Sequence, residues 1–500
     1  MSSGAPEMNG PADQGIVATR QDGNRELGRE VFRFETFGNE GFWTDGVRLP
    51  AGMAAARVTP MQALQLGLQV DVDAIDPATQ RALAQQLKDD PTGKTSALLN
   101  DPAVTTALVG ANAVVGFSAR NGKVGATCAL CHTMSDQSVF NLPGAGSIGH
   151  RRDGMANHGL NMGRILATGA NSRALYPMLQ LALRANHGKS LGRAPEGLTE
   201  HSTEAEVDAY FSNPAFYPVG MFDDTFDGNG DPMHNTPLFR QDLAAPFGSE
   251  GAIARLDNFG NLVYTSLFDL TMLTTPGGRA LVHKLAGAAG DEMVNNYVQI
   301  LSETGVRGYP FVTAAPHPMP GTEDAPLGVR VDNDKLLAMN AYLASLQAPR
   351  GAPINAAVAM RGRETFRSAG CTTCHNVSQG VRVPSTVHPM AEVFPGDNPV
   401  VLAQRMPPLT PVMNTTASFF DDKMAVFNAS IRGEKRGVTM PLLLDLARKP
   451  VFLHDNSAPS LDALLDGSRG ASAPHPFYLT DARRRSDVIA YLRSLDTNSR

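Results

Sequence analysis

Cysteine, long apolar runs and basic charge are all scarce in this sequence. Only four of its 500 residues are cysteines, and only one is a tryptophan. No apolar run reaches the ~18 residues that indicate a membrane-spanning helix, so we predict no transmembrane segment. The formal net charge of −6 gives no basic excess, which argues against nucleic acid as a partner. Strand-like alternation is scarce as well, so we expect a mainly α protein.

All four cysteines fall in two C-x-x-C-H motifs. The motif residues are Cys128, Cys131 and His132 in the first copy and Cys371, Cys374 and His375 in the second. This spacing is the attachment signature of a c-type haem. Two thiols three positions apart can bond to the two vinyl groups of one porphyrin, and the next histidine lies beneath the iron as its proximal ligand. The sequence therefore predicts two covalently bound haem c groups.

Two other uses of the C-x-x-C pattern fit less well. A structural zinc site pairs two such motifs ~15–20 residues apart, whereas Cys131 and Cys371 lie in different halves of this chain. A redox-active dithiol needs neither the adjacent histidine nor a second copy. Haem attachment accounts for both features.

The expected haem c also predicts where the protein works. Haem c is attached outside the cytoplasmic membrane, so we expect a periplasmic or otherwise exported protein. The first seven residues contain neither the basic n-region nor the apolar h-region of a signal peptide. We therefore expect a mature or trimmed chain whose signal peptide has been removed.

Composition and turn signals predict three parts along the chain. Residues 1–24 are small and polar and are expected to be disordered. Residues 25–348 are expected to form a first cytochrome c-like haem domain with large, loop-rich insertions. The segment 347–353, with two prolines and a glycine, marks the boundary. Residues 349–500 are expected to form a compact second haem domain that ends in a helix over 481–495.

Several local signals predict individual elements. A capping residue precedes a proline at Thr59-Pro60, Asp76-Pro77 and Asp101-Pro102, which predicts three helix starts. The apolar period predicts a further helix over 335–346. Trp43 is expected in the core rather than at a cofactor.

The segment from Asp223 to Asp231 is rich in Asp, Asn and Gly and has two interpretations. Clustered acidic oxygens are typical of a calcium loop, but the EF-hand pattern needs Glu at its twelfth position. Counted from Asp223, that position is His234. An ordinary Asp/Asn/Gly turn is the alternative to calcium.

Two further stretches carry a resemblance to a known family. They are Ser147-Ile148-Gly149-His150, after the first motif, and the segment 448–461, which contains His454. With the two haem motifs, they make the chain resemble the bacterial di-haem cytochrome c peroxidase superfamily. That superfamily includes the methylamine-utilisation di-haem enzymes and, more distantly, the di-haem rubber oxygenases.

The resemblance has two departures that bear on function. The peroxidases place a tryptophan between their haems, whereas Trp43 lies far upstream of the first motif; Tyr264 and Phe259 are the aromatic residues considered for that space. The peroxidases also ligate the second haem with a methionine after the signature, but no methionine follows Leu461.

The motifs do not supply the sixth ligand of either iron, and the candidates for it are histidines and methionines. For haem 1 the resemblance favours His150, on a loop whose glycines at 144, 146, 149 and 154 predict easy movement. The other candidates for haem 1 are His158, Met134, Met155 and Met162. For haem 2, His475 lies between two prolines, just past the place of the family's methionine, and is favoured. The other candidates for haem 2 are His388, His454, Met390, Met406, Met413, Met424 and Met440.

The motifs and the resemblance lead to one favoured function and two alternatives. We expect a peroxidase-like oxidoreductase in which haem 1 reacts with peroxide or another small oxidant and His150 handles protons. Haem 2 would then receive electrons from a small donor such as a mono-haem cytochrome or a cupredoxin. The alternatives are a non-catalytic electron-transfer cytochrome and, less favoured, a haem oxygenase acting on a bulky organic substrate.

Overall fold

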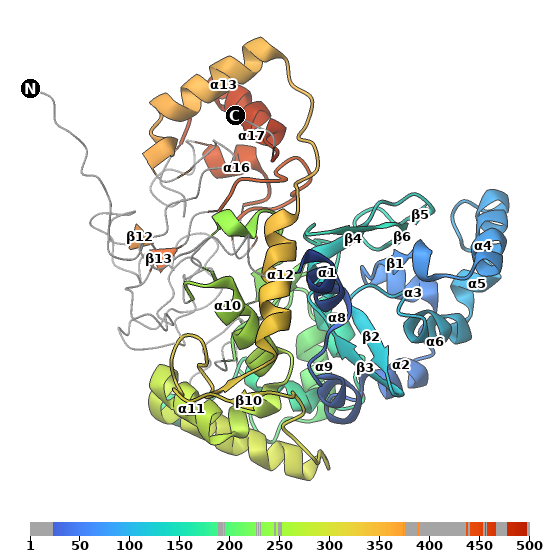
Figure 1. The fold of residues 1–500 in the computed structure, drawn as a ribbon, viewed down its shortest axis with the longest axis vertical. Coiled ribbons are helices and arrows are strands. Elements are labelled where there is room, and N and C mark those ends of the chain that lie inside the picture. The colour runs from blue at the N-terminus through green and yellow to red at the C-terminus, as the bar shows by residue number, and fades with distance from the viewer. Residues whose placement is uncertain are drawn as a thin grey trace, which may run out of the picture.

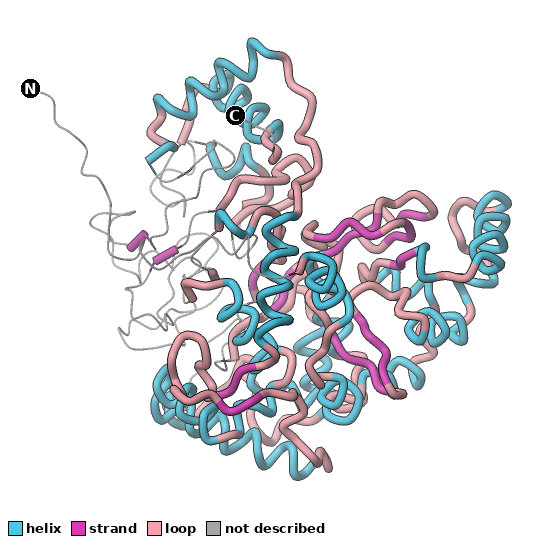
Figure 2. Tube along the Cα trace, viewed as in Figure 1, coloured by secondary structure: helices cyan, strands magenta, loops and turns pink. Residues whose placement is uncertain are grey.

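The computed structural model describes most of the chain. The described residues are 24–188, 194, 196–226, 228, 230, 232–244, 247–248, 253–373, 375, 388–389, 437–438, 441–453, 456, 458–466 and 478–497. Helices and loops dominate this part, and its strands are all short (Figures 1 and 2). The expectation of a mainly α protein is therefore confirmed. The segment 1–24, expected to be disordered, lies outside the described residues apart from Asn24.

A crossed helix pair brings together the two ends of the first predicted unit. Helix α1 (Arg25–Phe34) begins after Asn24, whose side chain accepts from the first turn, and packs on α12 (Asn333–Ser345) (Figure 1). Gly28 lies at the crossing, because a Cβ added there would be 2.0 Å from the Ala338 carbonyl oxygen. The rings of Phe32 and Tyr342 meet beside it, with centroids 5.8 Å apart. Helix α12 confirms the helix predicted over 335–346.

A second helix pair repeats this arrangement near the C-terminus. Helix α13 (Ala356–Ser368) packs on α17 (Ala482–Ser494), which confirms the predicted closing helix. Gly362 lies at the crossing, where an added Cβ would be 2.3 Å from the Asp487 carbonyl oxygen. Phe366 and Tyr491 meet with ring centroids 6.3 Å apart.

Between α1 and α12 the chain forms mostly short helices and one longer helical segment, α11 (Pro276–Glu303), which is kinked at Gly287. The three proline-led starts are confirmed as α3 (Pro60–Gln65), α4 (Pro77–Asp89) and α6 (Pro102–Gly110). The other short helices are α2 (Leu49–Ala55), α5 (Ala97–Asn100), α7 (Ala129–His132), α8 (Met162–Leu166), α9 (Glu204–Ser212) and α10 (Leu256–Leu262). In the C-terminal part, α16 (Leu461–Leu465) is a single turn.

The strands pair into small sheets of two or three strands. A three-stranded sheet has the order β1 (Val70–Asp71), β6 (Ser147–Gly149), β5 (Phe140–Asn141), with β1 parallel to β6. The antiparallel pairs are β2 (Phe117–Arg120) with β3 (Lys123–Ala126), β4 (Thr133–Ser135) with β7 (Arg151–Asp153), β8 (Met221–Phe222) with β9 (Met233–His234), β10 (Ala315–Pro316) with β11 (Val329–Arg330), and β12 (His388–Pro389) with β13 (Gly437–Val438).

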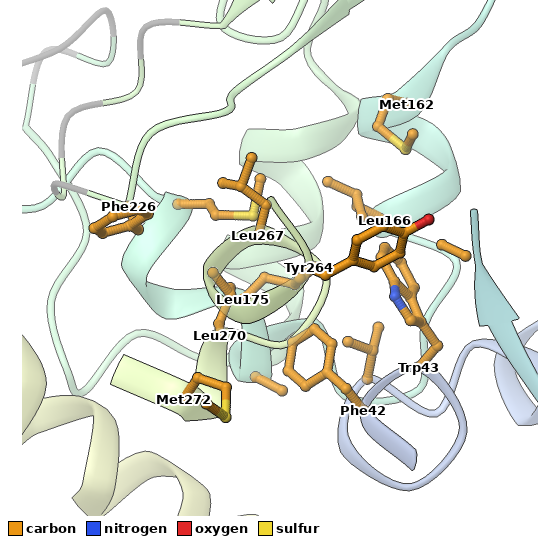
Figure 3. Packing of buried hydrophobic residues seen from close by; sticks show 14 of the residues in the cluster. Phe42, Trp43, Met162, Leu166, Leu175, Phe226, Tyr264, Leu267, Leu270 and Met272 are labelled. Carbon is orange, nitrogen blue, oxygen red and sulfur yellow. The ribbon is translucent and has the colours of Figure 1, made fainter. Parts of the chain in front are cut away.

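The largest apolar core lies in the part of the chain before residue 348, and a smaller one lies in the C-terminal part. Trp43 is 3% exposed within the larger core, so its predicted core position is confirmed. Figure 3 shows Trp43 beside Phe42 and near Tyr264 in this core. The smaller core contains Cys371 of the second motif together with Phe366 and Tyr491. Among the described residues, no helix has the length and apolar character needed to cross a membrane.

Candidate functional site

The first C-x-x-C-H motif lies on a single helical turn. Cys128 is the residue before α7, and Cys131 and His132 lie within that helix. The turn is placed by the β2–β3 hairpin, because Thr127 N donates to the Gly116 carbonyl at 2.9 Å. Gly116 has a positive φ, and an added Cβ would be 2.1 Å from Leu130 Cα. No larger residue fits where the hairpin meets the motif.

His132 has the tautomer that a proximal iron ligand needs. Its Nδ1 lies 2.7 Å from the carbonyl oxygen of Thr236, and only an N–H can bond to that acceptor. The lone pair is therefore on Nε2. Burial lowers the pKa of His132 to about 4, so the ring is neutral near pH 7. A neutral imidazole whose second nitrogen donates to a carbonyl is the usual arrangement of a metal-binding histidine.

The two thiols of this motif are protonated at neutral pH. Burial raises the pKa of Cys128 to about 11. Burial, followed by the charges of Cys128 and Asp224, raises the pKa of Cys131 to about 12. Neither cysteine forms a disulfide. Thiols buried in an apolar site have raised pKa values of this kind. Because these two thiols stay protonated, they are not favoured as thiolate ligands of a metal ion.

Two loop segments hold the end of α7 from the other side. Gly154 N donates to the His132 carbonyl at 2.8 Å, and Asn157 N donates to the Cys131 carbonyl at 2.9 Å. The side chain of Asn235 then donates to the Asn157 carbonyl at 2.9 Å. Thus segments 154–158 and 233–236 form one bonded frame around the motif.

Tyr264 lies directly against the first motif. It is fully buried on a π-helical turn (Val263–Leu267), and its hydroxyl oxygen is 3.4 Å from Cys128 Sγ. Its ring meets Phe37 edge-on at 4.5 Å. Of the two aromatic residues considered for the space between the haems, Phe259 packs near Phe247 instead, with centroids 6.3 Å apart.

His150 lies between strands β6 and β7. Its imidazole is exposed, and Nδ1 bonds to Asp73 at 2.9 Å. The hydrogen bond and charge of Asp73 raise the pKa of His150. Ligation of haem 1 by His150 stays a prediction, and it would require this ion pair to rearrange.

Two of the glycines around His150, Gly146 and Gly149, have packing roles. A Cβ at Gly146 would be 2.1 Å from the Leu68 carbonyl oxygen, and one at Gly149 would be 2.3 Å from Asp136 Oδ1. Gly146 N also donates to the Leu64 carbonyl at 2.7 Å. Close approach of neighbouring chain, rather than ease of movement, accounts for these two glycines.

The other candidates for haem 1 differ in their surroundings. Met162 is a core residue of α8, Met155 packs near Phe239, and Met134 is half-buried in β4. His158 lies on the frame segment 154–158, next to Asn157. Burial, followed by the charge of Lys449, lowers the pKa of His158 to about 4, and its buried Nδ1 has no hydrogen-bond partner among the described atoms.

His234 connects this frame to the C-terminal part of the chain. Its Nδ1 is 2.5 Å from the Leu453 carbonyl oxygen, and its Nε2 is 2.8 Å from Lys449 Nζ. The ring of His158 lies 6.5 Å from the ring of His234. Burial lowers the pKa of Lys449 to about 8. Sequence reasoning considered His234 only as a position in a calcium loop, and it did not consider Lys449 or Thr236.

The second motif is described in part. Cys371 is 4% exposed, and His375 N donates to the Cys371 carbonyl at 3.0 Å. The His375 ring lies 6.4 Å from Phe366. Cys374 lies outside the described residues. So do the following candidates for haem 2: His454, His475, Met390, Met406, Met413, Met424 and Met440. The side chain of His388 is likewise not described, so the sixth ligand of haem 2 stays a prediction.

The candidate calcium segment is also described in part. Asp223 Oδ1 accepts from Thr225 N at 3.1 Å and from its hydroxyl at 2.7 Å, as in an Asx turn. Asp227, Asn229 and Asp231 lie outside the described residues. Calcium binding stays a prediction.

Comparisons with known proteins add little to this site. No family model and no curated protein matches the chain. Among solved structures, it is similar to a hydrazine synthase of Kuenenia stuttgartiensis pressurised with 20 bar xenon, at 14% identity and a TM-score of 0.28. The match covers 55% of this chain and 76% of that chain. A likeness at this TM-score carries no argument about fold or function.

Proposed function

We propose that this chain is an exported di-haem c-type cytochrome with peroxidase-like oxidoreductase activity, of the di-haem cytochrome c peroxidase type. The hydrogen bond from His132 Nδ1 to the Thr236 carbonyl carries the proposal. It places a neutral imidazole, with its lone pair on Nε2, directly after two protonated thiols with haem-attachment spacing. A redox dithiol has no need of such a histidine.

The repeated helix pair supports a second haem unit. Each motif follows a helix with the residues Gly-Arg-Glu-x-Phe-Arg, at 28–33 and at 362–367. Each partner helix carries Ala-Tyr-Leu-x-Ser-Leu, at 341–346 and at 490–495. An N-terminal helix, a C-x-x-C-H motif and a C-terminal helix are the parts of a cytochrome c domain. We therefore assign 25–348 and 349–500 to two such domains.

The residues have separable roles in this proposal. Cys128 and Cys131 would hold haem 1, and Cys371 and Cys374 would hold haem 2. Bound haem supplies one-electron redox chemistry and, where an iron position is open, a place for peroxide. Thr236 keeps the proton of His132 on Nδ1. Tyr264 packs against Cys128 and would line that side of the haem 1 site.

Protons and electrons are supplied by different groups in this proposal. His150, whose Nδ1 bonds to Asp73 and whose pKa is raised by that carboxylate, is proposed as the proton donor. Two electrons, one from each of two donor molecules, together with two protons reduce one hydrogen peroxide to two water molecules. The donor, a mono-haem cytochrome or a cupredoxin, would deliver electrons through haem 2.

Haem stoichiometry tests the foundation of this proposal. The chain, exported in a host that matures c-type cytochromes, should contain two haems that acid-acetone does not extract. The double variant C128S/C131S should retain one haem, and so should C371S/C374S. A haemochrome assay giving fewer than two haems in the unaltered protein would refute the assignment.

Spin state separates the peroxidase from the electron carrier. Electron paramagnetic resonance of the half-reduced protein should show a high-spin ferric haem 1, together with turnover of peroxide. If both haems stay low spin in every redox state and peroxide is not consumed, the chain is an electron-transfer cytochrome instead.

A further inference from the structure

We propose that the Tyr264 hydroxyl donates a hydrogen bond to the thioether sulfur of Cys128 and thereby raises the midpoint potential of haem 1. This inference rests on the proposed attachment of a haem at Cys128, but not on peroxidase activity. Tyr264 would act through the sulfur, as a positioning residue and not as a catalytic group.

The tyrosine oxygen and the sulfur meet in a site that is closed to solvent. The Tyr264 hydroxyl oxygen lies 3.4 Å from Cys128 Sγ, and Tyr264 has no exposed surface. Burial, followed by the proximity of Cys128, raises the pKa of Tyr264. The hydroxyl therefore keeps its proton at neutral pH and can act as a donor.

Attachment of the haem decides which of the two atoms donates. The thiol adds across a vinyl double bond, so that the sulfur binds one vinyl carbon and the thiol proton passes to the other. No oxidant or reductant is consumed in this step. The thioether sulfur keeps lone pairs but has no proton, so it can only accept. Tyr264 is then the donor of the pair.

The hydroxyl proton has a competing acceptor in the Glu35 carbonyl oxygen. This oxygen also lies 3.4 Å from the Tyr264 oxygen. Hydroxyl groups that bond well to oxygen do so at about 2.5–3.0 Å, so the bond to Glu35 is long and weak. The same separation is ordinary for sulfur, because sulfur has a larger radius. The two distances therefore favour the sulfur as acceptor.

The end of α1 and the turn after it position both partners. Thr127, the residue before the motif, donates its hydroxyl to the Arg33 carbonyl at 3.1 Å. The ring of Tyr264 meets Phe37 edge-on, with centroids 4.5 Å apart, and meets Phe268 on another side at 5.3 Å. One short segment thus sets the place of the hydroxyl relative to the motif.

The sign of the effect follows from the direction of the O–H dipole. Reduction adds an electron to the iron and its porphyrin, and the dipole turns its positive end toward the sulfur at the porphyrin edge. The attraction is stronger in a buried site than in water. Hydrogen bonds near the haem and burial are among the means by which a protein sets a haem potential. The contact should therefore stabilise the reduced haem 1.

Y264F tests the bond in the protein with both haems attached, because it removes the hydroxyl and keeps the ring. A redox titration followed by visible spectra should give a lower midpoint potential for haem 1 and an unchanged potential for haem 2. Y297F is the matched control, since Tyr297 is equally buried and donates to the Ala174 carbonyl at 2.8 Å. It should leave both potentials unchanged. An unaltered haem 1 potential in Y264F overturns the proposal.

A cycle with C128A separates the bond to sulfur from a general effect of the tyrosine. In C128A, haem 1 is held by Cys131 alone and the sulfur acceptor is missing. Adding Y264F to C128A should then change the haem 1 potential little. A purely structural role would give the same change with and without Cys128. Equal changes in the two backgrounds therefore also overturn the proposal.

Vibrational spectra of the unaltered protein decide the question if Y264F does not fold or loses haem 1. The C–S stretching band of haem 1 should differ between protein produced in H2O and in D2O, because O–D replaces O–H at the sulfur. Identical bands overturn the proposal. An unaltered protein without a haem at Cys128 refutes the proposed function and this inference with it, whereas two attached haems with no effect of Y264F refute this inference alone.

Discussion

The helix pair α1–α12 and the helix pair α13–α17 share one design, yet they enclose very different lengths of chain. In both pairs the helices cross at the glycine that begins a Gly-Arg-Glu-x-Phe-Arg sequence, and in both a phenylalanine packs on a tyrosine. The first pair encloses residues 35–332, whereas the second encloses 369–481. The same crossing thus occurs with two very different lengths of intervening chain.

The two pairs differ in how they are tied to their motifs. In the first, Asp153 accepts from Arg33 Nε and from the Tyr342 hydroxyl, both at 2.6 Å, and from the Thr133 hydroxyl at 3.0 Å. Thr133 directly follows His132, so this buried carboxylate joins both helices to the motif. In the second pair the comparable ion pair, Arg361–Asp487, bonds helix to helix at the surface. Among the described residues, the buried carboxylate of Asp153 ties the first helix pair to its motif, whereas Arg361–Asp487 joins only the two helices of the second pair.

The largest expected effect tests the shared crossing. Gly28→Ala places a Cβ 2.0 Å from the Ala338 carbonyl oxygen, and Gly362→Ala places one 2.3 Å from the Asp487 carbonyl oxygen. Each should lower the free energy of unfolding by about 3 kcal/mol, because the helices must separate. Urea unfolding followed by circular dichroism measures this.

Gly110→Ala is the control for these two variants, since no atom lies within 4 Å of the added carbon. It should change the free energy of unfolding by less than about 1 kcal/mol. If Gly28→Ala or Gly362→Ala were as mild as the control, the crossing would not be close-packed.

The next effect tests the difference in the polar ties. Arg33→Ala leaves the buried carboxylate of Asp153 without its cation and should cost about 3 kcal/mol. Arg361→Ala removes an exposed arginine that pairs with Asp487, and its loss of stability should be much smaller than that of Arg33→Ala. Equal losses in thermal unfolding experiments would contradict the contrast between the two units.

The smallest effect compares two histidines of the first unit, His150 facing solvent and His158 facing the second unit. The pKa of His158 is lowered to about 4, so between pH 6.5 and 4 the unfolded chain binds a proton that the folded chain does not. The free energy of unfolding therefore falls as the pH falls through that window. His158→Asn should flatten this loss.

His150 should show the opposite sign. Asp73 raises its pKa, so its stabilising contribution is complete below about pH 6.5 and is lost as the pH rises through the folded pKa. His150→Asn should remove that contribution. Urea midpoints of both variants at pH 4, 5, 6.5 and 8 give the two profiles. Parallel profiles would show that the two surroundings do not differ as described.

Part of this molecule could be predicted because it depends on neighbours in the sequence. Helix starts at Pro60, Pro77 and Pro102 were predicted correctly, since a cap and a proline act within one turn. Helices α12 and α17 followed from their apolar period. The repeated Gly-Arg-Glu-x-Phe-Arg pattern was a signal for the paired helices that the prediction did not use.

The contacts around the first motif could not be predicted in this way. Tyr264 reaches Cys128, and Thr236 reaches His132, across more than a hundred residues. Nothing local to these residues identifies their partners. The glycines near His150 show the same limit, because they predicted easy movement and the structure gives Gly146 and Gly149 a packing role.

The sequence by itself determined which thiols, at what spacing, and which histidine the proposal assigns to haem attachment. Covalent spacing along a chain is a local property and survives any fold. Only the tertiary structure decided that His132 donates to Thr236 and that His234 holds Lys449 and Leu453. It also decided that His150 pairs with Asp73. These choices depend on which distant segments pack together, because a hydrogen bond forms only when folding brings donor and acceptor within ~3 Å.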